Sequence, residues 1–156
     1  MSPELEDLYQ QVLLDHSKHP RNFGQIAAGA VRVHGDNPSC GDEIDLQVRF
    51  GPAQEVAEIK FTGQGCAICL ASASMMTTKL KGLTRAQAVD LAEAFHALVT
   101  GADAPAASGL GDLQLLEGVR KFPQRVKCAM LAWRAFQQAL HAPATDAATV
   151  STEGGS

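Results

Sequence analysis

A regular alternation of apolar and polar residues over positions 44–50 constrains the fold more than any other stretch of the sequence. A period of two is typical of a β-strand with one buried face. A Gly-Pro-Ala-Gln turn follows at 51–54, and a second alternation occupies 57–61. These two strands predict an antiparallel hairpin. A weaker alternation over 31–34 predicts a third strand, which precedes the hairpin in the chain.

Helical periodicity accounts for most of the remaining chain. We expect helices at 4–19, 66–81, 84–100 and 123–140, with a short helical turn at 112–117. The fold class is therefore α+β: a three-stranded, mainly antiparallel sheet packed against four to five helices in a single domain. The domain should span 1–141. The Ala/Thr/Ser/Gly-rich segment 142–156 should be a disordered tail.

Composition narrows the classes of function. The 156 residues are 46% apolar and 19% charged, which is typical of a globular protein. The net charge of −4 and the lack of a dense Lys/Arg run argue against nucleic acid as the main partner. The N-terminus is acidic where a secretory signal would be basic, and the weakly polar stretch 66–76 is too short to span a bilayer.

We therefore expect a cytoplasmic protein with no membrane partner. Cytosolic thiols are usually kept reduced. The four cysteines are thus better explained as metal ligands or reactive thiols than as two disulfides.

The segment Asn37-Pro-Ser-Cys-Gly-Asp42 has the composition of a loop, and it presents a thiol two positions from a carboxylate. Cys40 and Asp42 could share one metal ion. Alternatively, the carboxylate could tune or orient the thiol.

The other cysteines differ in their helical positions. Cys66 opens a helix, where the dipole favours a thiolate. Cys128 faces away from the apolar stripe of the last helix, which favours a role in a site, and Arg125 lies one turn earlier on the same side. Arg125 could stabilise a thiolate or could simply be exposed. Cys69 falls on a buried stripe and could be a core residue, or it could form a Cys-x-x-Cys ligand or redox pair with Cys66.

Three sulfurs and one oxygen from Cys40, Asp42, Cys66 and Cys128 would suit tetrahedral zinc. Four anionic ligands around a divalent ion leave a net charge of about −2, which Arg125 or a neighbouring lysine could offset. Spacing alone does not rank Asp42 above Cys69 as the fourth ligand.

Three ordered motifs resemble the SufU-type members of the IscU/NifU N-terminal family, and the resemblance covers roughly residues 5–140. The motifs are the segment 37–42 above, Gly63-Gln-Gly-Cys-Ala-Ile68 running into 71–76, and Arg125-Val-Lys-Cys-Ala-Met-Leu-Ala-Trp133. Members that resemble the IscU scaffold have a histidine immediately before the last cysteine, where this chain has Lys127. Residues 111–123 are similar to the insertion that marks the SufU type.

The resemblance implies an IscU/SufE-like fold with zinc held by Cys40, Asp42, Cys66 and Cys128. It also implies a zinc-dependent sulfurtransferase. A SufS-type, pyridoxal-phosphate-dependent cysteine desulfurase would deliver persulfide sulfur to Cys40, and the sulfur would pass to a downstream iron–sulfur scaffold. Arg125 would steady the charged site or the partner contact. A cysteine at position 69 is a departure from the family pattern.

Two other functions remain open. The same cysteines could assemble an iron–sulfur cluster on a non-enzymatic scaffold, because soft thiolates bind zinc and such clusters alike. The protein could also be a zinc-stapled adaptor that activates its partner allosterically.

Overall fold

The structure is a computed structural model of the chain. It describes residues 3–26, 29–38, 41–101, 110–141 and 147–151. The elements follow one another as α1 (Pro3–Lys18), β1 (Val31–Asn37), β2 (Asp42–Phe50), β3 (Val56–Gln64), α2 (Ala67–Leu80), α3 (Arg85–Thr100), the 3₁₀ segment η1 (Gly111–Lys121), α4 (Pro123–His141) and β4 (Ala147–Ser151). Among the described residues, no helix combines the length and apolar character needed to cross a bilayer.

The three expected strands form the antiparallel part of the sheet. β2 pairs antiparallel with β3 and with β1, as the alternating pattern predicted. The inward-facing residues of β2 are almost fully buried, Ile44 being 0% and Leu46 1% exposed. The predicted α+β class with a three-stranded antiparallel sheet and several helices is therefore confirmed.

One expectation about the C-terminus was wrong. The segment 147–151, which we assigned to a disordered tail, forms β4 and pairs parallel with β1, so that the sheet order is β3-β2-β1-β4. The physical reason is the open edge of β1, whose backbone groups gain partners from a segment containing the β-branched pair Thr149 and Val150. Residues 142–146 and 152–156 lie outside the described residues.

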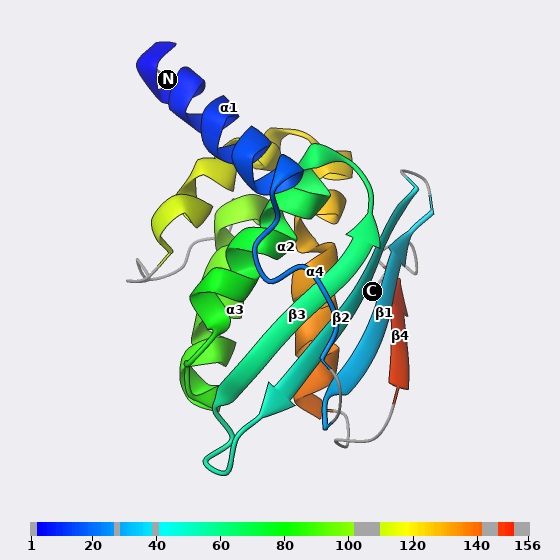
Figure 1. Cartoon of the computed structure of the whole chain (residues 1–156). Helices are drawn as coiled ribbons and strands as arrows, with labels where there is room; N and C mark the ends of the chain where they lie inside the picture. Colours follow the sequence, from blue (N-terminus) through cyan, green and yellow to red (C-terminus); the bar gives the residue numbers. More distant parts are fainter. Residues whose placement is uncertain (1–2, 27–28, 39–40, 102–109, 142–146, 152–156) are drawn as a thin grey trace.

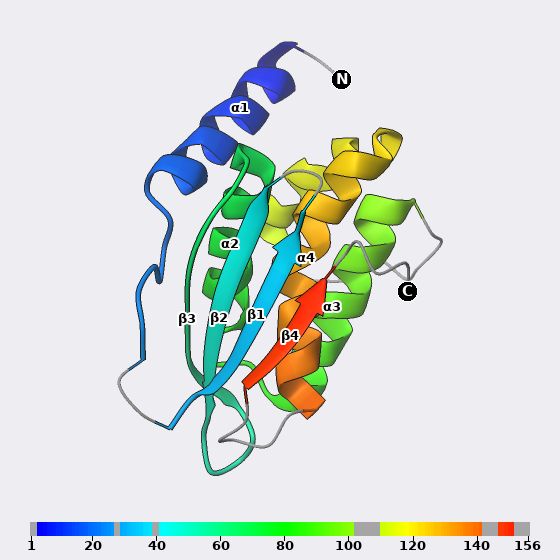
Figure 2. The same ribbon diagram turned by 90° about the vertical axis from the view of Figure 1, so that its right-hand side faces the viewer.

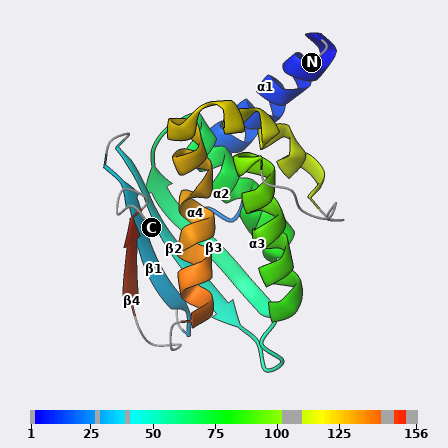
Figure 3. The same cartoon turned by 180° about the vertical axis from the view of Figure 1, so that it is seen from behind.

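The helices form layers on one face of the sheet (Figures 1 and 3). α4 packs against β1 and β2, and α2 packs against β3 and α4. α3 lies farther from the sheet, against α4 and η1. Its capping box, predicted from Thr84 and Gln87, is present. The segment η1 is longer than the short turn that we expected.

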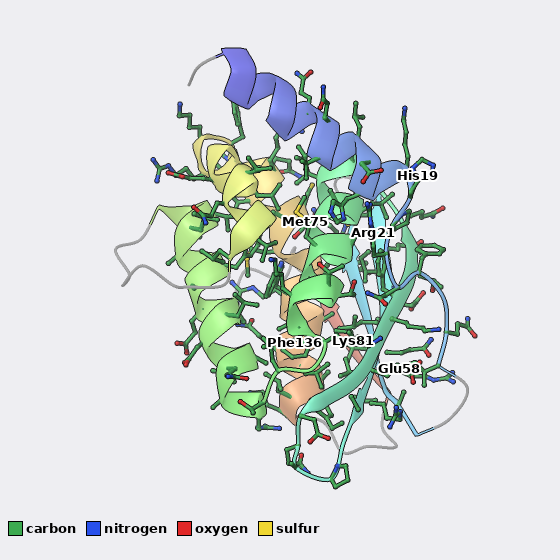
Figure 4. All side chains as sticks on the ribbon, turned by 60° about the vertical axis from the view of Figure 1, so that its left-hand side comes forward. His19, Arg21, Glu58, Met75, Lys81 and Phe136 are labelled. Atoms are coloured by element: carbon green, nitrogen blue, oxygen red, sulfur yellow. The ribbon has the colours of Figure 1, made fainter. Side chains whose placement is uncertain are left out.

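A buried contact between aromatic and hydroxyl groups locks α2, α3 and α4 together. The ring of Trp133 stacks on Phe95 with centroids 4.6 Å apart. Its Nε1–H donates to Ser72 Oγ at 3.1 Å, and the Ser72 hydroxyl donates to the Ala129 carbonyl at 2.6 Å. Met75 and Phe136, labelled in Figure 4, belong to the same core. The two helices that carry Cys66 and Cys128 are thus held at a fixed separation.

Helix α1 projects from one end of the molecule (Figures 1 and 2). The C-terminal end of α1 is fixed to α2. Nδ1 of the buried His16 lies 2.7 Å from Ser74 Oγ, and the same hydroxyl accepts the backbone N–H of Arg21 at 2.8 Å. His19 and Arg21 mark this end of α1 in Figure 4. These contacts also hold the chain as it leaves α1 toward the edge of β3, where Phe23 stacks edge-on against Phe61.

Candidate metal site

β1 and β3 end, and β2, α2 and α4 begin, at one end of the molecule (Figure 1). Three side chains from separate elements meet there. They are Asp42, the first residue of β2; Cys66, immediately before α2; and Cys128, in the second turn of α4. One ligand atom from each lies within 4.8 Å of the others. Asp42 and Cys128 are 0% and 3% exposed, and Cys66 is half-buried.

Asp42 is held from two sides. Its Oδ1 accepts the backbone N–H of Cys66 at 2.9 Å, a charge-assisted hydrogen bond that joins β2 to the start of α2. The connection can approach this closely because of Gly65, at which a Cβ atom would lie 2.5 Å from Asp42 Oδ1. A Cβ at Gly63 would lie 2.2 Å from the carbonyl oxygen of Glu43. Both glycines of the Gly-x-Gly-Cys segment are therefore required by packing.

Cys66 is the N-cap residue of α2, as predicted from the start of that helix. Its Sγ accepts the backbone N–H of Cys69 at 3.4 Å, so the sulfur is the capping acceptor. A hydrogen bond with the Cys128 thiol, followed by smaller contributions from backbone donors, lowers the pKa of Cys66 to about 6. Burial opposes this shift. Cys66 is thus the more acidic of the two thiols in the metal-free protein.

The pKa of Cys128 moves in the opposite direction. It is raised because the Cys128 thiol donates to Cys66, because the side chain is buried, and because Asp42 lies nearby. One proton is therefore held between two sulfurs beside a carboxylate. A cation at this point would take the place of that proton and offset the negative charge.

The donor set fits the zinc ion that the sequence motifs imply. Two sulfurs and a carboxylate oxygen are zinc ligands, and a tetrahedral site needs one donor more. Cys40, the fourth expected ligand, lies outside the described residues, as does Ser39. The turn that contains it is bounded by Asn37 and Asp42, which are paired across β1 and β2.

Two residues from the sequence analysis take other positions. Cys69 is fully buried in the core, as its stripe indicated, and it is not among the three side chains that converge. Arg125 lies one turn before Cys128 with an exposed side chain, and it forms no salt bridge with an acidic residue in the described part of the chain.

Sequence reasoning missed Asn37 as a member of the site. The residue is 0% exposed, and its Nδ2 lies 3.5 Å from Asp42 Oδ2 and 3.7 Å from Cys128 Sγ. A strand that ends in asparagine directly before the Pro-Ser-Cys turn was the signal available, but asparagine in such a place is usually explained by turn formation alone.

Comparisons with known proteins place this fold in a described family. Residues 8–129 match the family model described as the NifU-like N terminal domain. The chain belongs to this family. It is 44% identical over 137 residues to the iron–sulfur cluster assembly scaffold protein IscU of Streptococcus pyogenes, covering 88% of this chain and 85% of that protein.

A SufU-type relative has a similar sequence identity to this chain. The zinc-dependent sulfurtransferase SufU of Bacillus subtilis is 41% identical over 134 residues, covering 86% of this chain and 90% of that protein. The solved structure of FiSufU from Fervidobacterium islandicum AW-1, described as a putative iron–sulfur cluster assembly scaffold protein for the SUF system, is similar with a TM-score of 0.79 at 30% identity, over 86% of this chain and 98% of that one. The resemblance to SufU-type members of an iron–sulfur cluster assembly family is confirmed.

Proposed function

We propose that this protein is a zinc-dependent sulfurtransferase, which accepts persulfide sulfur from a cysteine desulfurase on Cys40 and passes it on for iron–sulfur cluster assembly. The observation that carries the proposal is the convergence of Asp42, Cys66 and Cys128 beside the turn that contains Cys40. The similarity to a relative named as a zinc-dependent sulfurtransferase supports it.

Zinc, when bound, would keep the ligating thiols deprotonated at neutral pH without leaving them freely nucleophilic. The chain's own residues would divide the remaining work. Cys66 and Cys128 sit on helices whose core contacts fix them, and Asp42 is fixed by the Cys66 amide. Cys40, on the turn, would be the thiol that moves.

The transfer step is a thiol exchange. The Cys40 thiolate attacks the outer sulfur of the desulfurase persulfide, a new S–S bond forms on Cys40, and the desulfurase cysteine leaves as a thiolate. Electrons balance without an external oxidant. Arg125, exposed one turn from Cys128, would steady negative charge on the docked partner or at the site. The partner is expected to be a SufS-type, pyridoxal-phosphate-dependent enzyme.

Mass spectrometry tests this proposal directly. The protein is incubated with a SufS-type desulfurase and cysteine, its thiols are blocked, and its peptides are mapped. We expect the mass of one added sulfur on the peptide containing Cys40, and none on that peptide in Cys40→Ala. If Cys40→Ala stimulates desulfurase turnover as strongly as the unmodified protein does, the protein is an allosteric adaptor and the transfer proposal is wrong.

The second candidate is a cluster scaffold, which the 44% identity to a relative named as a scaffold favours. This chain has Lys127 at the position where members that resemble the IscU scaffold have histidine, and this difference argues for transfer instead. Metal analysis separates the two. Colourless protein with one zinc per chain supports transfer, whereas brown protein that retains iron and sulfide after anaerobic reconstitution supports the scaffold.

A further inference from the structure

Asn37 has contacts that reach beyond the turn that follows it. It is the last residue of β1, its side chain is fully buried, and it is paired across the sheet with Asp42. Its amide nitrogen faces two of the candidate ligands, at 3.5 Å from Asp42 Oδ2 and 3.7 Å from Cys128 Sγ. These two ligands come from a strand and a helix that the sequence separates widely. Asn37 is thus a polar group shared between them.

The chemistry of the neighbours determines how the amide is oriented. A carboxylate oxygen and a cysteine sulfur both accept hydrogen bonds, whereas the amide oxygen of asparagine could only repel them. The NH₂ group has two N–H donors, which is enough for one to each acceptor. The two distances are long for hydrogen bonds to a single acceptor and are consistent with a donor group positioned between two.

The same kind of contact exists at the other described sulfur. Cys66 Sγ accepts the backbone N–H of Cys69, and Cys128 Sγ accepts the side-chain N–H of Asn37. An N–H···S hydrogen bond draws charge from a thiolate and makes it a weaker nucleophile. Both sulfurs in the described part of the site are therefore hydrogen-bonded in a way that suits ligands that stay on a metal.

We propose that Asn37 is a positioning residue of the metal site. It orients Asp42 and Cys128 toward a shared cation and restrains the Cys128 thiolate, so that Cys128 remains a resident ligand. The proposal deepens the proposed function and rests on it for the presence of a thiolate-bound metal. It assigns a distinct task to a neutral side chain that supplies no ligand atom itself. Outer partners of this kind typically change metal affinity about 10- to 100-fold when removed.

A purely structural role for Asn37 would lower stability without affecting the metal. The test therefore needs a matched control. Asn37→Leu removes the donors while keeping a branched side chain of similar size. Gln47→Leu removes another buried amide from the same sheet, one whose Oε1 accepts the Ile26 N–H at 2.6 Å and which is absent from the ligand group.

Three measurements on the full chain separate the two roles. Cobalt(II) is titrated in competition with a chelator, the sulfur-to-cobalt charge-transfer band is recorded, and the alkylation of Cys128 in zinc-loaded protein is followed by peptide mass spectrometry. We expect Asn37→Leu to weaken cobalt binding about 10- to 100-fold. We also expect it to shift the band to longer wavelength and to speed alkylation of Cys128. Gln47→Leu should lower the melting temperature and change none of the three.

The outcomes are distinct. If Asn37→Leu lowers only the melting temperature, as Gln47→Leu does, the positioning role is wrong while the metal site stands. If the unmodified protein gives no sulfur-to-cobalt band, the proposed function fails, and this inference fails with it. Should Asn37→Leu not fold, Asn37→Ala and Asn37→Ser provide the same comparison. The serine hydroxyl should recover part of the affinity lost in the alanine variant, and equal affinities would overturn the proposal.

Discussion

Replacing Gly65 with alanine should disturb the candidate metal site through a single added methyl group. The new Cβ would lie 2.5 Å from Asp42 Oδ1, 3.1 Å from its Cγ and 3.2 Å from its Cα. A Cβ atom essentially never approaches another atom to 2.5 Å, and Asp42 is fully buried with its backbone in β2. The carboxylate must therefore move away from the Cys66 N–H, to which it is bonded at 2.9 Å.

The magnitude follows from two costs. Losing a hydrogen bond to a charged group costs about 1.5–3 kcal/mol. Forcing an extra methyl group into a packed region costs about 1–3 kcal/mol. Together they predict a loss of about 2.5–6 kcal/mol in the free energy of unfolding, or a fall in Tm of roughly 5–24 °C for a chain of this size. Zinc affinity should fall as well, because Asp42 is displaced.

The assay is urea unfolding of metal-free Gly65→Ala, with chelator competition for its zinc affinity. Gly118→Ala is the control, since a Cβ there would meet no atom within 4 Å. It should stay within about 0.5 kcal/mol of the unmodified protein. An unchanged urea midpoint together with unchanged zinc affinity in Gly65→Ala would refute the inferred contact between the glycine turn and Asp42.

Three further predictions concern titration and the fourth cysteine. In metal-free protein, alkylation of Cys66 should rise through a midpoint near pH 6 rather than the usual value of about 8.5. Because the folded-state pKa of Cys66 is lowered, the stability linked to its ionisation is present above the unfolded pKa and is lost as pH falls through about 6. Cys128→Ala removes the hydrogen bond that lowers this pKa and should move the alkylation midpoint up. The hydrogen bond that the His34 ring donates to the Asp45 carboxylate raises the pKa of His34, so its linked stability is present below 6.5 and is lost as pH rises through the folded value; NMR titration of Asp45→Asn should show a lower pKa. Cys69→Ser should lower the Tm yet keep zinc stoichiometry, and loss of zinc would show that the ligand set is wrong.

The sequence was most informative where a local pattern and the final packing demand the same residues. The alternation in β2 predicted its buried face because a pleated strand places every second side chain on one side. The position of Cys69 on a helical stripe predicted its burial, because a helix places residues three and four apart on one face. In contrast, β4 was missed because it depends on the distant edge of β1, and nothing within 147–151 reveals that edge.

The candidate site shows the same division. Cys66 and Cys128 could be selected from helix geometry, but only the fold brings them within 4.8 Å of Asp42. Cys40 and Arg125 remain predictions, the first because it lies outside the described residues and the second because its side chain is exposed away from any described acidic partner.

The contacts of the described ligands explain why transfer and scaffold functions can share one architecture. Asp42, Cys66 and Cys128 are each fixed by a hydrogen bond from an N–H group: a backbone amide for the first two and Asn37 for the third. One carboxylate and two sulfurs restrained in this way would suit either zinc or an iron–sulfur cluster, since both favour thiolates. The ligand that completes the site must therefore decide between the two functions. A fourth thiol that leaves the metal favours sulfur transfer, whereas one that stays favours a cluster, and the position of added sulfur in the desulfurase experiment distinguishes them.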